Sequence, residues 1–289
     1  MNDTLQTADG LSLQVRTWPL ASSSLTHGTL LIVHGLGEHI GRYDHVAAQL
    51  NACGWNVVGY DQRGHGRSGG DRGRLAAADS LLQDLARVID AVGDEHAGPL
   101  LLLGHSMGGL VAARFVAEGL LSSPAAWHRA VDALVLSSPA LDAGMNAVQK
   151  LLLAVMGPLA PNLAVNNGLK PAWISRDPAV VAAYVADPQV HDRVTPRLAR
   201  FIVDGGGFVR ANAARWTVPT LLLFAGSDRC VAPAGSRAFA SAAPPAVLTT
   251  REFAPLFHEV FNEPEQAEVF AVLGAWLNPL ARVTGRRES

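Results

Sequence analysis

Short apolar runs rich in branched side chains alternate along the chain with longer segments in which apolar residues recur every three or four positions. This alternation is typical of a parallel sheet covered by helices on both faces. The predicted strands cover residues 28–33, 55–60, 100–103, 131–136, 220–224 and 247–250. The predicted helices cover residues 43–52, 80–92, 107–120, 234–242 and 265–277. The pattern therefore predicts an α/β protein with a mostly parallel central sheet.

Two segments show how the period separates a helix from a strand. In residues 80–92, the apolar side chains of Leu81, Leu85 and Val88 recur at spacings of three and four, which predicts one buried helix face. Residues 11–18 instead alternate between apolar and polar side chains. That pattern predicts an antiparallel edge strand with one face toward water.

One interval between predicted strands is too long for a simple crossover. About 80 residues separate Leu136 from Thr220, whereas a parallel connection needs a dozen or more. A structureless loop of that length is uncommon in a compact domain. Because six prolines lie within residues 141–209 of this interval, we expect several short helices. We predict a helical cap over residues 141–209, inserted after the sixth strand, on a core formed by residues 1–140 and 210–289.

Composition narrows the classes of function. Of the 289 residues, 49% are hydrophobic, which is enough for a sizeable core. The 23 basic and 25 acidic residues give a net charge of -2, so nucleic acid is not an expected partner. Cys53 and Cys230 lack a metal-like spacing and indicate no disulfide framework. Residues 1–6 lack a signal-peptide pattern, and we predict a cytoplasmic protein.

The most informative motif is Gly-His-Ser-Met-Gly at residues 104–108, which lies between an apolar strand and a predicted helix. A serine in such a sharp turn is exposed at the apex. Small residues are needed at Gly104 and Gly108, because strand and helix approach closely there. The alternative is a glycine-rich helix start without a chemical role. The flanking strand and helix favour Ser106 as an activated nucleophile.

A serine hydroxyl needs an imidazole to accept its proton and a carboxylate to orient that imidazole. In this arrangement the order along the chain is serine, acid, histidine. Asp228 follows a predicted strand and a glycine turn, and His258 is the one histidine after His191. The chain order therefore predicts a triad of Ser106, Asp228 and His258.

Alternatives exist for both partners of the serine. Asp228 could be a turn or helix-capping residue, a common role at such a place. Asp142 and Asp204 are rival acids, and Asp142 follows the preceding strand. His258 could be a surface histidine. His105, next to Ser106 in the sequence, is expected to pack beneath the turn.

Acyl transfer also needs two N–H donors for the oxyanion of the tetrahedral intermediate. The residue after the nucleophile, Met107, supplies one of them. The loop of residues 34–37, His-Gly-Leu-Gly, follows an earlier strand and is placed to supply the second from Leu36. The alternative is an ordinary glycine turn, but its two glycines free the backbone to direct an amide inward.

Several motifs carry a resemblance to a known family. They are His-Gly-Leu-Gly-Glu-His at residues 34–39 with Arg42-Tyr43 following, Tyr-Asp-Gln-Arg-Gly-His-Gly-Arg-Ser at 60–68, and Gly-His-Ser-Met-Gly-Gly at 104–109. Together they resemble the monoacylglycerol lipase and lysophospholipase branch of the α/β-hydrolases, the serine aminopeptidase S33-type hydrolases. Residues 224–228 and 257–259 extend the resemblance toward the end of the chain.

The resemblance implies the α/β-hydrolase fold, with a mostly parallel sheet, helices on both faces and a helical cap. It implies the same triad, Ser106, Asp228 and His258, and the same oxyanion amides, Leu36 and Met107. It also implies that residues 61–68 form a structural loop outside the proton relay. Nothing in the sequence calls for a metal or an organic cofactor, since side chains and amides supply the chemistry.

The predicted cap contains eleven consecutive residues without a polar side chain, residues 151–161. The run is too short to span a bilayer, but it suits an apolar entrance or a contact with a membrane surface. The alternative is an ordinary helix in the interior of the cap. If the run lines an apolar entrance, Leu152, Val155 and Met156 are candidate substrate-binding residues.

These features predict a carboxylic ester hydrolase that works through an acyl-enzyme on single-chain lipid esters such as monoacylglycerols. Lysophospholipids and small esters are the alternatives within the same chemistry. A different class remains open as well, since the same fold hosts lyases, cofactor-free peroxidases and ligand receptors. The order of the triad residues favours the hydrolase.

Overall fold

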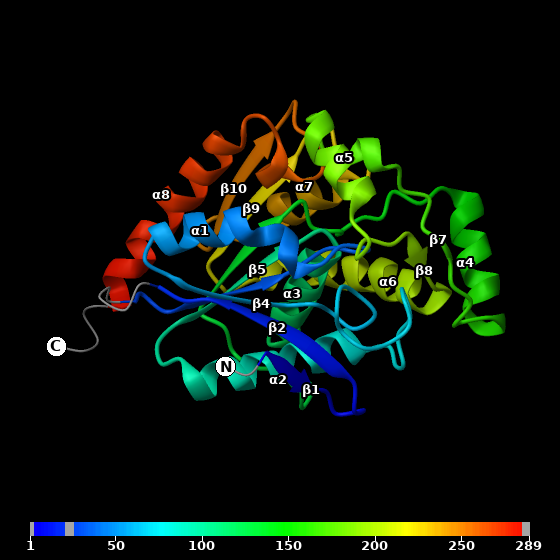
Figure 1. Cartoon of the computed structure of the whole chain (residues 1–289), viewed down its shortest axis with the longest axis horizontal. Helices are drawn as coiled ribbons and strands as arrows, with labels where there is room; N and C mark the ends of the chain where they lie inside the picture. Colours follow the sequence, from blue (N-terminus) through cyan, green and yellow to red (C-terminus); the bar gives the residue numbers. More distant parts are fainter. Residues whose placement is uncertain (1–2, 21–25, 285–289) are drawn as a thin grey trace.

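The computed structural model describes residues 3–20 and 26–284, so Met1 and Asn2 of the N-terminal segment discussed above lie outside the described residues (Figure 1). Eight strands form one sheet in the order β1-β2-β4-β3-β5-β6-β9-β10. These strands are β1 (Thr4–Gln6), β2 (Ser12–Trp18), β3 (Thr29–Val33), β4 (Asn56–Tyr60), β5 (Leu100–His105), β6 (Ala133–Ser137), β9 (Thr220–Ala225) and β10 (Leu248–Phe253).

The six strands from β4 to β10 in this order are parallel, as the sequence pattern predicts. Strand β2 is antiparallel to β4, which was also expected. The prediction that β2 lies at the edge is wrong, because the short strand β1 pairs with its outer side. A three-residue strand gives too brief a pattern to be recognised from sequence.

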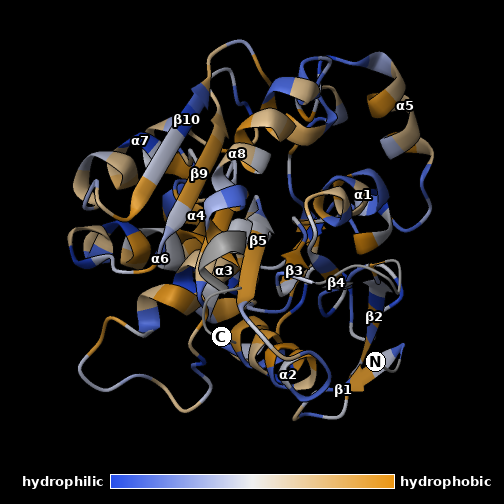
Figure 2. Cartoon of the chain, turned by 90° about the vertical axis from the view of Figure 1, so that its left-hand side faces the viewer, coloured by the Kyte–Doolittle hydropathy of each residue, from blue (hydrophilic) through white to orange (hydrophobic). Residues whose placement is uncertain are grey.

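Helices cover both faces of the sheet, and the apolar strands β3, β5 and β9 lie between them (Figure 2). The core against one face includes side chains of α1 (Asp44–Ala52) and α8 (Gln266–Thr284). The core against the other includes α2 (Ser80–Glu95), α3 (Met107–Glu118) and α7 (Pro233–Ala242). The predicted stripe of α2 is buried, including Leu81, Leu85 and Val88. The two-sided architecture confirms the predicted fold class.

The long interval between β6 and β9 folds into several short elements, as its prolines indicate. In chain order these are α4 (Ala147–Leu159), β7 (Val165–Asn166), the 3₁₀ helix η2 (Pro171–Trp173), α5 (Pro178–Ala186), β8 (Arg193–Val194), α6 (Pro196–Asn212) and the 3₁₀ helix η3 (Ala213–Arg215). Strands β7 and β8 pair with each other, apart from the main sheet.

The last α-helix of this interval, α6, packs against α3 of the core. Its side chains Leu198, Phe201 and Val209 belong to the same apolar cluster as α2 and α3. The predicted end of the cap at residue 209 therefore falls inside a helix that also contributes to the core. The division into a core and a cap at residues 141 and 209 stays a prediction.

Candidate active site

Ser106 lies in the sharp turn between β5 and α3, with a φ of 53° and a ψ of -119°. A non-glycine residue in this conformation stores strain of about 1–3 kcal/mol. The predicted need for small neighbours is confirmed. A Cβ atom on Gly104 would lie 2.5 Å from the Gly108 carbonyl oxygen, and one on Gly108 would lie 2.0 Å from that of Val33. The strand, turn and helix thus hold the serine at an apex.

The structure brings Ser106, His258 and Asp228 together, although they come from three separate loops. The His258 Nε2 atom lies 2.8 Å from Ser106 Oγ, and the Ser106 hydroxyl can donate to it. On the other side of the ring, His258 Nδ1 lies 2.7 Å from Asp228 Oδ2 and donates to it. The side chains of His258 and Asp228 are buried. This is the hydrogen-bond chain that proton transfer from a serine requires.

Asp228 also fills the structural role considered as its alternative. Its other oxygen, Oδ1, accepts hydrogen bonds from the amides of Cys230 at 2.8 Å and Val231 at 3.1 Å. One carboxylate therefore closes its own turn and orients the imidazole. The rival acids lie elsewhere, since Asp142 accepts from Gly144 in its own loop and Asp204 is exposed on α6.

The electrostatics of the site suit a general base. Burial alone would lower the pKa of His258, but the charge and hydrogen bond of Asp228, with a further effect of Glu259, raise it above the ordinary value. Behind His258 lies the ring of His105, whose centroid is 4.8 Å from that of His258. Burial and the neighbouring His258 lower the pKa of His105 to about 4. His105 is therefore a neutral neighbour, held by Ser137 at 3.1 Å.

The two predicted oxyanion donors flank this serine. Leu36 lines the same cavity as Ser106, and Met107 begins helix α3 directly after the serine. Within residues 3–20 and 26–284, neither amide donates a hydrogen bond to another group. A Cβ atom on Gly35 would lie 3.2 Å from Ser106 Cβ, so the loop approaches the nucleophile closely.

A buried network of charges lies behind the loop of residues 34–37, here called the oxyanion loop. The sequence pattern assigned this network no role. Glu38 accepts hydrogen bonds from the Gly35 amide at 2.6 Å, the Tyr43 hydroxyl at 2.7 Å and Arg42 at 2.7 Å. Arg42 also donates two bonds to Glu259, at 2.7 and 2.8 Å. Burial opposes ionisation of Glu38, but Arg42 and its other neighbours outweigh burial and bring its pKa to about 2.

The sequence did contain a signal for this network. Glu38 and Arg42 belong to the motif that carries the family resemblance, and Glu259 directly follows His258. What the sequence could not give is the pairing of Arg42 with Glu259, which lies 217 positions further along the chain. The network links the oxyanion loop to the loop that carries His258.

Residues between α4 and α6 also contact the oxyanion loop and the adjacent His39. The Gly37 carbonyl accepts from the His191 amide at 2.8 Å, and His39 Nε2 lies 2.8 Å from Asp187 Oδ2. Gly37 has a φ of 78°, and a Cβ atom there would lie 2.3 Å from the His191 carbonyl oxygen. Glycine is therefore needed for this close approach.

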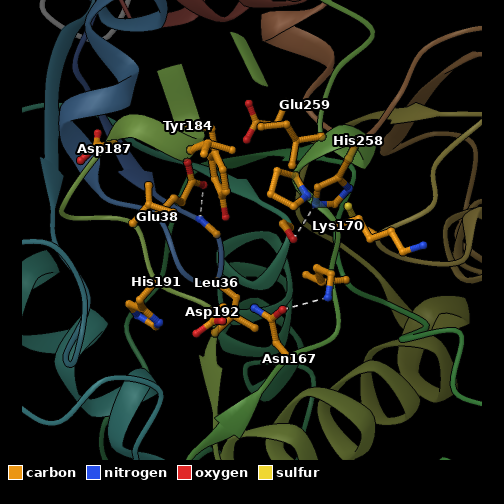
Figure 3. Close-up of a pocket in the computed structure, with 18 of the residues that line it drawn as sticks. Leu36, Glu38, Asn167, Lys170, Tyr184, Asp187, His191, Asp192, His258 and Glu259 are labelled. Atoms are coloured by element: carbon orange, nitrogen blue, oxygen red, sulfur yellow. Dashed lines mark hydrogen bonds between the residues drawn. The ribbon is translucent and has the colours of Figure 1, made fainter. Parts of the chain in front are cut away.

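A cavity of about 620 Å³ lies between these residues and the core, and Ser106, Leu36 and His258 are among the residues that line it. This volume is in the usual range for a small-molecule site. Figure 3 shows Tyr184 and His258 on one side of the cavity and His191, Asp192 and Asn167 on the other. The wall combines apolar side chains with several polar ones.

The candidate substrate-binding residues on α4 do not line this cavity. Leu152 and Val155 are exposed and Met156 is half-buried, all on a helix without a buried residue. Figure 1 shows α4 at the right-hand edge of the molecule, away from the sheet. The cavity wall is instead formed by the segment around α5, including Tyr184 and Val185.

Cys230 lines the cavity and is buried. A possible ligand atom from each of Asp228, Cys230 and His258 lies within 4.8 Å of the others, which is a spacing that could hold a metal ion. However, Asp228 and His258 already share a hydrogen bond, and burial together with Asp228 raises the pKa of the Cys230 thiol far above its ordinary value. Cys230 is therefore an un-ionised thiol in this arrangement.

A mostly parallel sheet with a serine at the turn after β5, an acid after β9 and a histidine after β10 defines an α/β-hydrolase with a serine nucleophile. Comparisons with known proteins agree with this class. The family model described as serine aminopeptidase, S33, matches residues 25–265. The chain belongs to this family and is an ester-hydrolysing enzyme.

Individual relatives extend the comparison. The chain is 37% identical over 254 residues to a monoacylglycerol lipase of Mycolicibacterium smegmatis, which covers 86% of this chain and 88% of the relative. It is 29% identical over 250 residues to a phospholipase of Bacillus subtilis, covering 86% and 93% of the two chains. The crystal structure of a monoacylglycerol lipase from Paleococcus ferrophilus aligns with a TM-score of 0.81 at 32% identity, covering 93% and 99%.

Proposed function

We propose that Ser106, His258 and Asp228 catalyse ester hydrolysis through an acyl-enzyme. Ser106 Oγ attacks the ester carbonyl carbon while His258 Nε2 accepts its proton, and Asp228 stabilises the resulting imidazolium. The Leu36 and Met107 amides bind the oxyanion. The intermediate collapses to the acyl-enzyme, and the alcohol leaves with the proton from His258. Water repeats the sequence and releases the acid. The 2.7 and 2.8 Å bonds of His258 carry this proposal.

The proposed substrates are monoacylglycerols. The mycobacterial and archaeal relatives are named for that activity, and the cavity above Ser106 combines apolar residues, such as Leu36 and Val190, with polar ones, such as Tyr184 and Asn167. An apolar wall suits an acyl chain, and hydroxyl or amide groups suit the hydroxyls of a glycerol.

Hydrolysis of a series of monoacylglycerols and small esters, by the wild type and by Ser106→Ala, tests this function. The wild type should release fatty acid in multiple turnovers, and a fluorophosphonate should label Ser106 stoichiometrically. Ser106→Ala should lose about 10⁶-fold in kcat. Turnover in the variant that equals the wild type would exclude the mechanism. A preference for two-carbon acyl groups over long ones would exclude the lipid assignment.

Lysophospholipids are the second candidate, because the Bacillus relative is named a phospholipase and the cavity wall includes Arg72 and Lys170. These cations suit a phosphate group. Lysophosphatidylcholine and a monoacylglycerol of the same chain length distinguish the two in parallel assays. Ligand-induced stabilisation without product release would instead favour a receptor of the same fold.

We further propose that α4 rests on a lipid surface while the substrate enters. Its exposed apolar side chains include Val148, Leu151 and Leu159, which are 74%, 66% and 76% exposed. No helix among the described residues is long and apolar enough to cross a membrane. The arrangement suits a cytoplasmic protein that binds membranes peripherally, with α4 lying in the interface.

Sedimentation with phosphatidylcholine vesicles tests the lipid contact. Replacing Leu151 and Leu152 by serine removes two exposed leucines and should weaken vesicle binding about a hundredfold or more, since each leucine buried in the lipid contributes about 1.5–3 kcal/mol. Turnover of a water-soluble ester should not change, because neither leucine lines the cavity. Vesicle binding equal to that of the wild type would refute this role for α4.

A further inference from the structure

The loop that carries the Leu36 amide is held at two successive peptide groups by residues outside the triad. In the first group, between His34 and Gly35, the His34 carbonyl accepts from Gln62 Nε2 at 2.6 Å. The amide of the same group, on Gly35, donates to Glu38 Oε1 at 2.6 Å. Both polar atoms of this peptide are therefore fixed, and its plane cannot rotate without breaking a buried hydrogen bond.

The second peptide group, between Gly35 and Leu36, is fixed on one side only. Its carbonyl accepts from His34 Nδ1 at 2.8 Å. A trans peptide is planar, so its N–H points opposite to its carbonyl. Because Gly35 O is directed at the His34 ring, the Leu36 N–H points away from that ring. Leu36 and Ser106 line the same cavity, and this amide has no partner in the described part of the chain.

Gln62 determines which nitrogen of His34 carries the proton. The backbone N–H of Gln62 donates to His34 Nε2 at 2.9 Å. A backbone amide only donates and a carbonyl only accepts, so Nε2 must be bare and Nδ1 must be protonated. One neutral tautomer satisfies both contacts. Burial lowers the pKa of His34, in agreement with a neutral ring.

We propose that His34 and Gln62 are positioning residues that aim the Leu36 amide at the oxyanion of the substrate. Gln62 fixes the His34 tautomer, His34 holds the Gly35 carbonyl, and the rigid peptide leaves the Leu36 N–H as the free donor. The inference rests on the proposed function of Leu36. It gives the segment of residues 61–68, through Gln62, a positioning role toward the loop of residues 34–37.

A pair of variants at His34 separates positioning from packing. In His34→Asn the side-chain Nδ2 takes about the place of the ring Nδ1 and keeps the donor to Gly35, whereas His34→Leu removes it. Loss of one oxyanion donor costs about 10²–10³-fold in kcat. We expect His34→Leu to lose about 10²-fold in kcat with KM within about threefold, and His34→Asn to recover about tenfold of that loss.

Gln62→Met provides a third variant, because it removes the bond to the His34 carbonyl and keeps the backbone amide. It should lower kcat about tenfold at nearly unchanged KM. Melting temperatures identify any variant that is merely unfolded at the assay temperature. Equal kcat values for wild type and a folded His34→Leu, or an asparagine variant no better than the leucine one, would overturn the inference.

The tautomer of His34 can also be measured directly in the wild type. Nitrogen-15 NMR of histidine-labelled protein at pH 7.5, with the signal assigned through His34→Asn, should show a proton on Nδ1 and none on Nε2. A proton on Nε2 would overturn the inference even if the enzyme were inactive. Absence of ester turnover by the wild type would refute the proposed function instead, so the two failures are distinguishable.

Discussion

Replacing Glu38 by glutamine tests whether the buried carboxylate stabilises the fold and the oxyanion loop together. Among the described residues, each hydrogen-bond partner of the Glu38 carboxylate donates to it, namely the Gly35 amide, the Tyr43 hydroxyl and Arg42. Glutamine keeps the shape but introduces an NH₂ group, which must then face a donor. In the part of the chain that the structure describes, Arg42 would also keep Glu259 as its one ion-pair partner. The substitution therefore removes a charge and creates an unsatisfied contact.

The magnitude follows from the pKa of Glu38, which Arg42 and the other neighbours hold at about 2, against burial and an ordinary value of 4.5. That difference corresponds to about 3 kcal/mol of folding free energy. Breaking a buried ion pair by removing one partner costs about 3–5 kcal/mol, which agrees. At pH 7 we expect the melting temperature of Glu38→Gln to fall by roughly 6 °C.

The sign of the pH dependence is fixed as well. A carboxyl group with a lowered pKa stabilises the folded state above pH 4.5 and loses that effect as the pH falls toward 2. The stability difference between wild type and Glu38→Gln should therefore shrink to about 2 kcal/mol at pH 3.5. Urea unfolding at pH 7 and at pH 3.5 measures both values.

Glu118→Gln is the matched control for this experiment. Glu118 is buried, pairs with Arg114 at 2.6 Å and accepts from the Ala125 amide at 2.9 Å, but it lies on α3 and lines no part of the cavity. Both variants should lose stability, and Glu38→Gln alone should also lower kcat. An unfolding free energy of Glu38→Gln at pH 7 that matches the wild type would refute the reasoning.

Three further predictions concern other parts of the chain. Asp228→Asn should lower kcat about 10⁴-fold and move the acid limb of the kcat/KM profile to lower pH, because it removes the charge that raises the pKa of His258. Gly108→Ala should fail to fold, since its Cβ would lie 2.0 Å from a backbone oxygen of β3. Gly207→Ala, inside helix α6, meets nothing within 4 Å and should melt at or slightly above the wild-type temperature, because alanine favours a helix over glycine. Burial and Arg72 lower the pKa of His191 to about 4, so the unfolded chain binds more protons below pH 6.5, and His191→Asn should lose less urea stability than the wild type between pH 7 and 5.

The part of the site that the sequence predicts well depends on local sterics and on chain order. Ser106 could be found because a serine between two glycines, after an apolar run and before a helix, satisfies one backbone geometry. Asp228 and His258 could be found because parallel strands place the loops that follow them at one edge of the sheet. These inferences need no knowledge of side-chain packing.

The rest depends on contacts between distant segments. The two carboxylates around Arg42 come from loops far apart in the sequence, and only the folded sheet brings them together. The role of residues 151–161 was open for a related reason. An apolar run in the sequence does not show which surface covers the helix. In the structure, α4 has no buried residue. Its apolar character is therefore presented to the outside and not to the cavity.

The inserted segment thus has two parts, the segment around α5 and helix α4, which differ in how closely they contact the site. The part around α5 is hydrogen-bonded to both halves of the site, through His191 to the oxyanion loop and through the Ile174 carbonyl to the amide of Glu259, beside His258. Helix α4 packs against α6, and none of its residues lines the cavity. Displacing α4 would therefore break few contacts of the site, whereas displacing α5 would disturb the oxyanion loop and the His258 loop at once. The proposed substrate entry on the α4 side is thus compatible with a preformed site, because the hydrogen bonds from the α5 segment to Gly37 and Glu259 need not break.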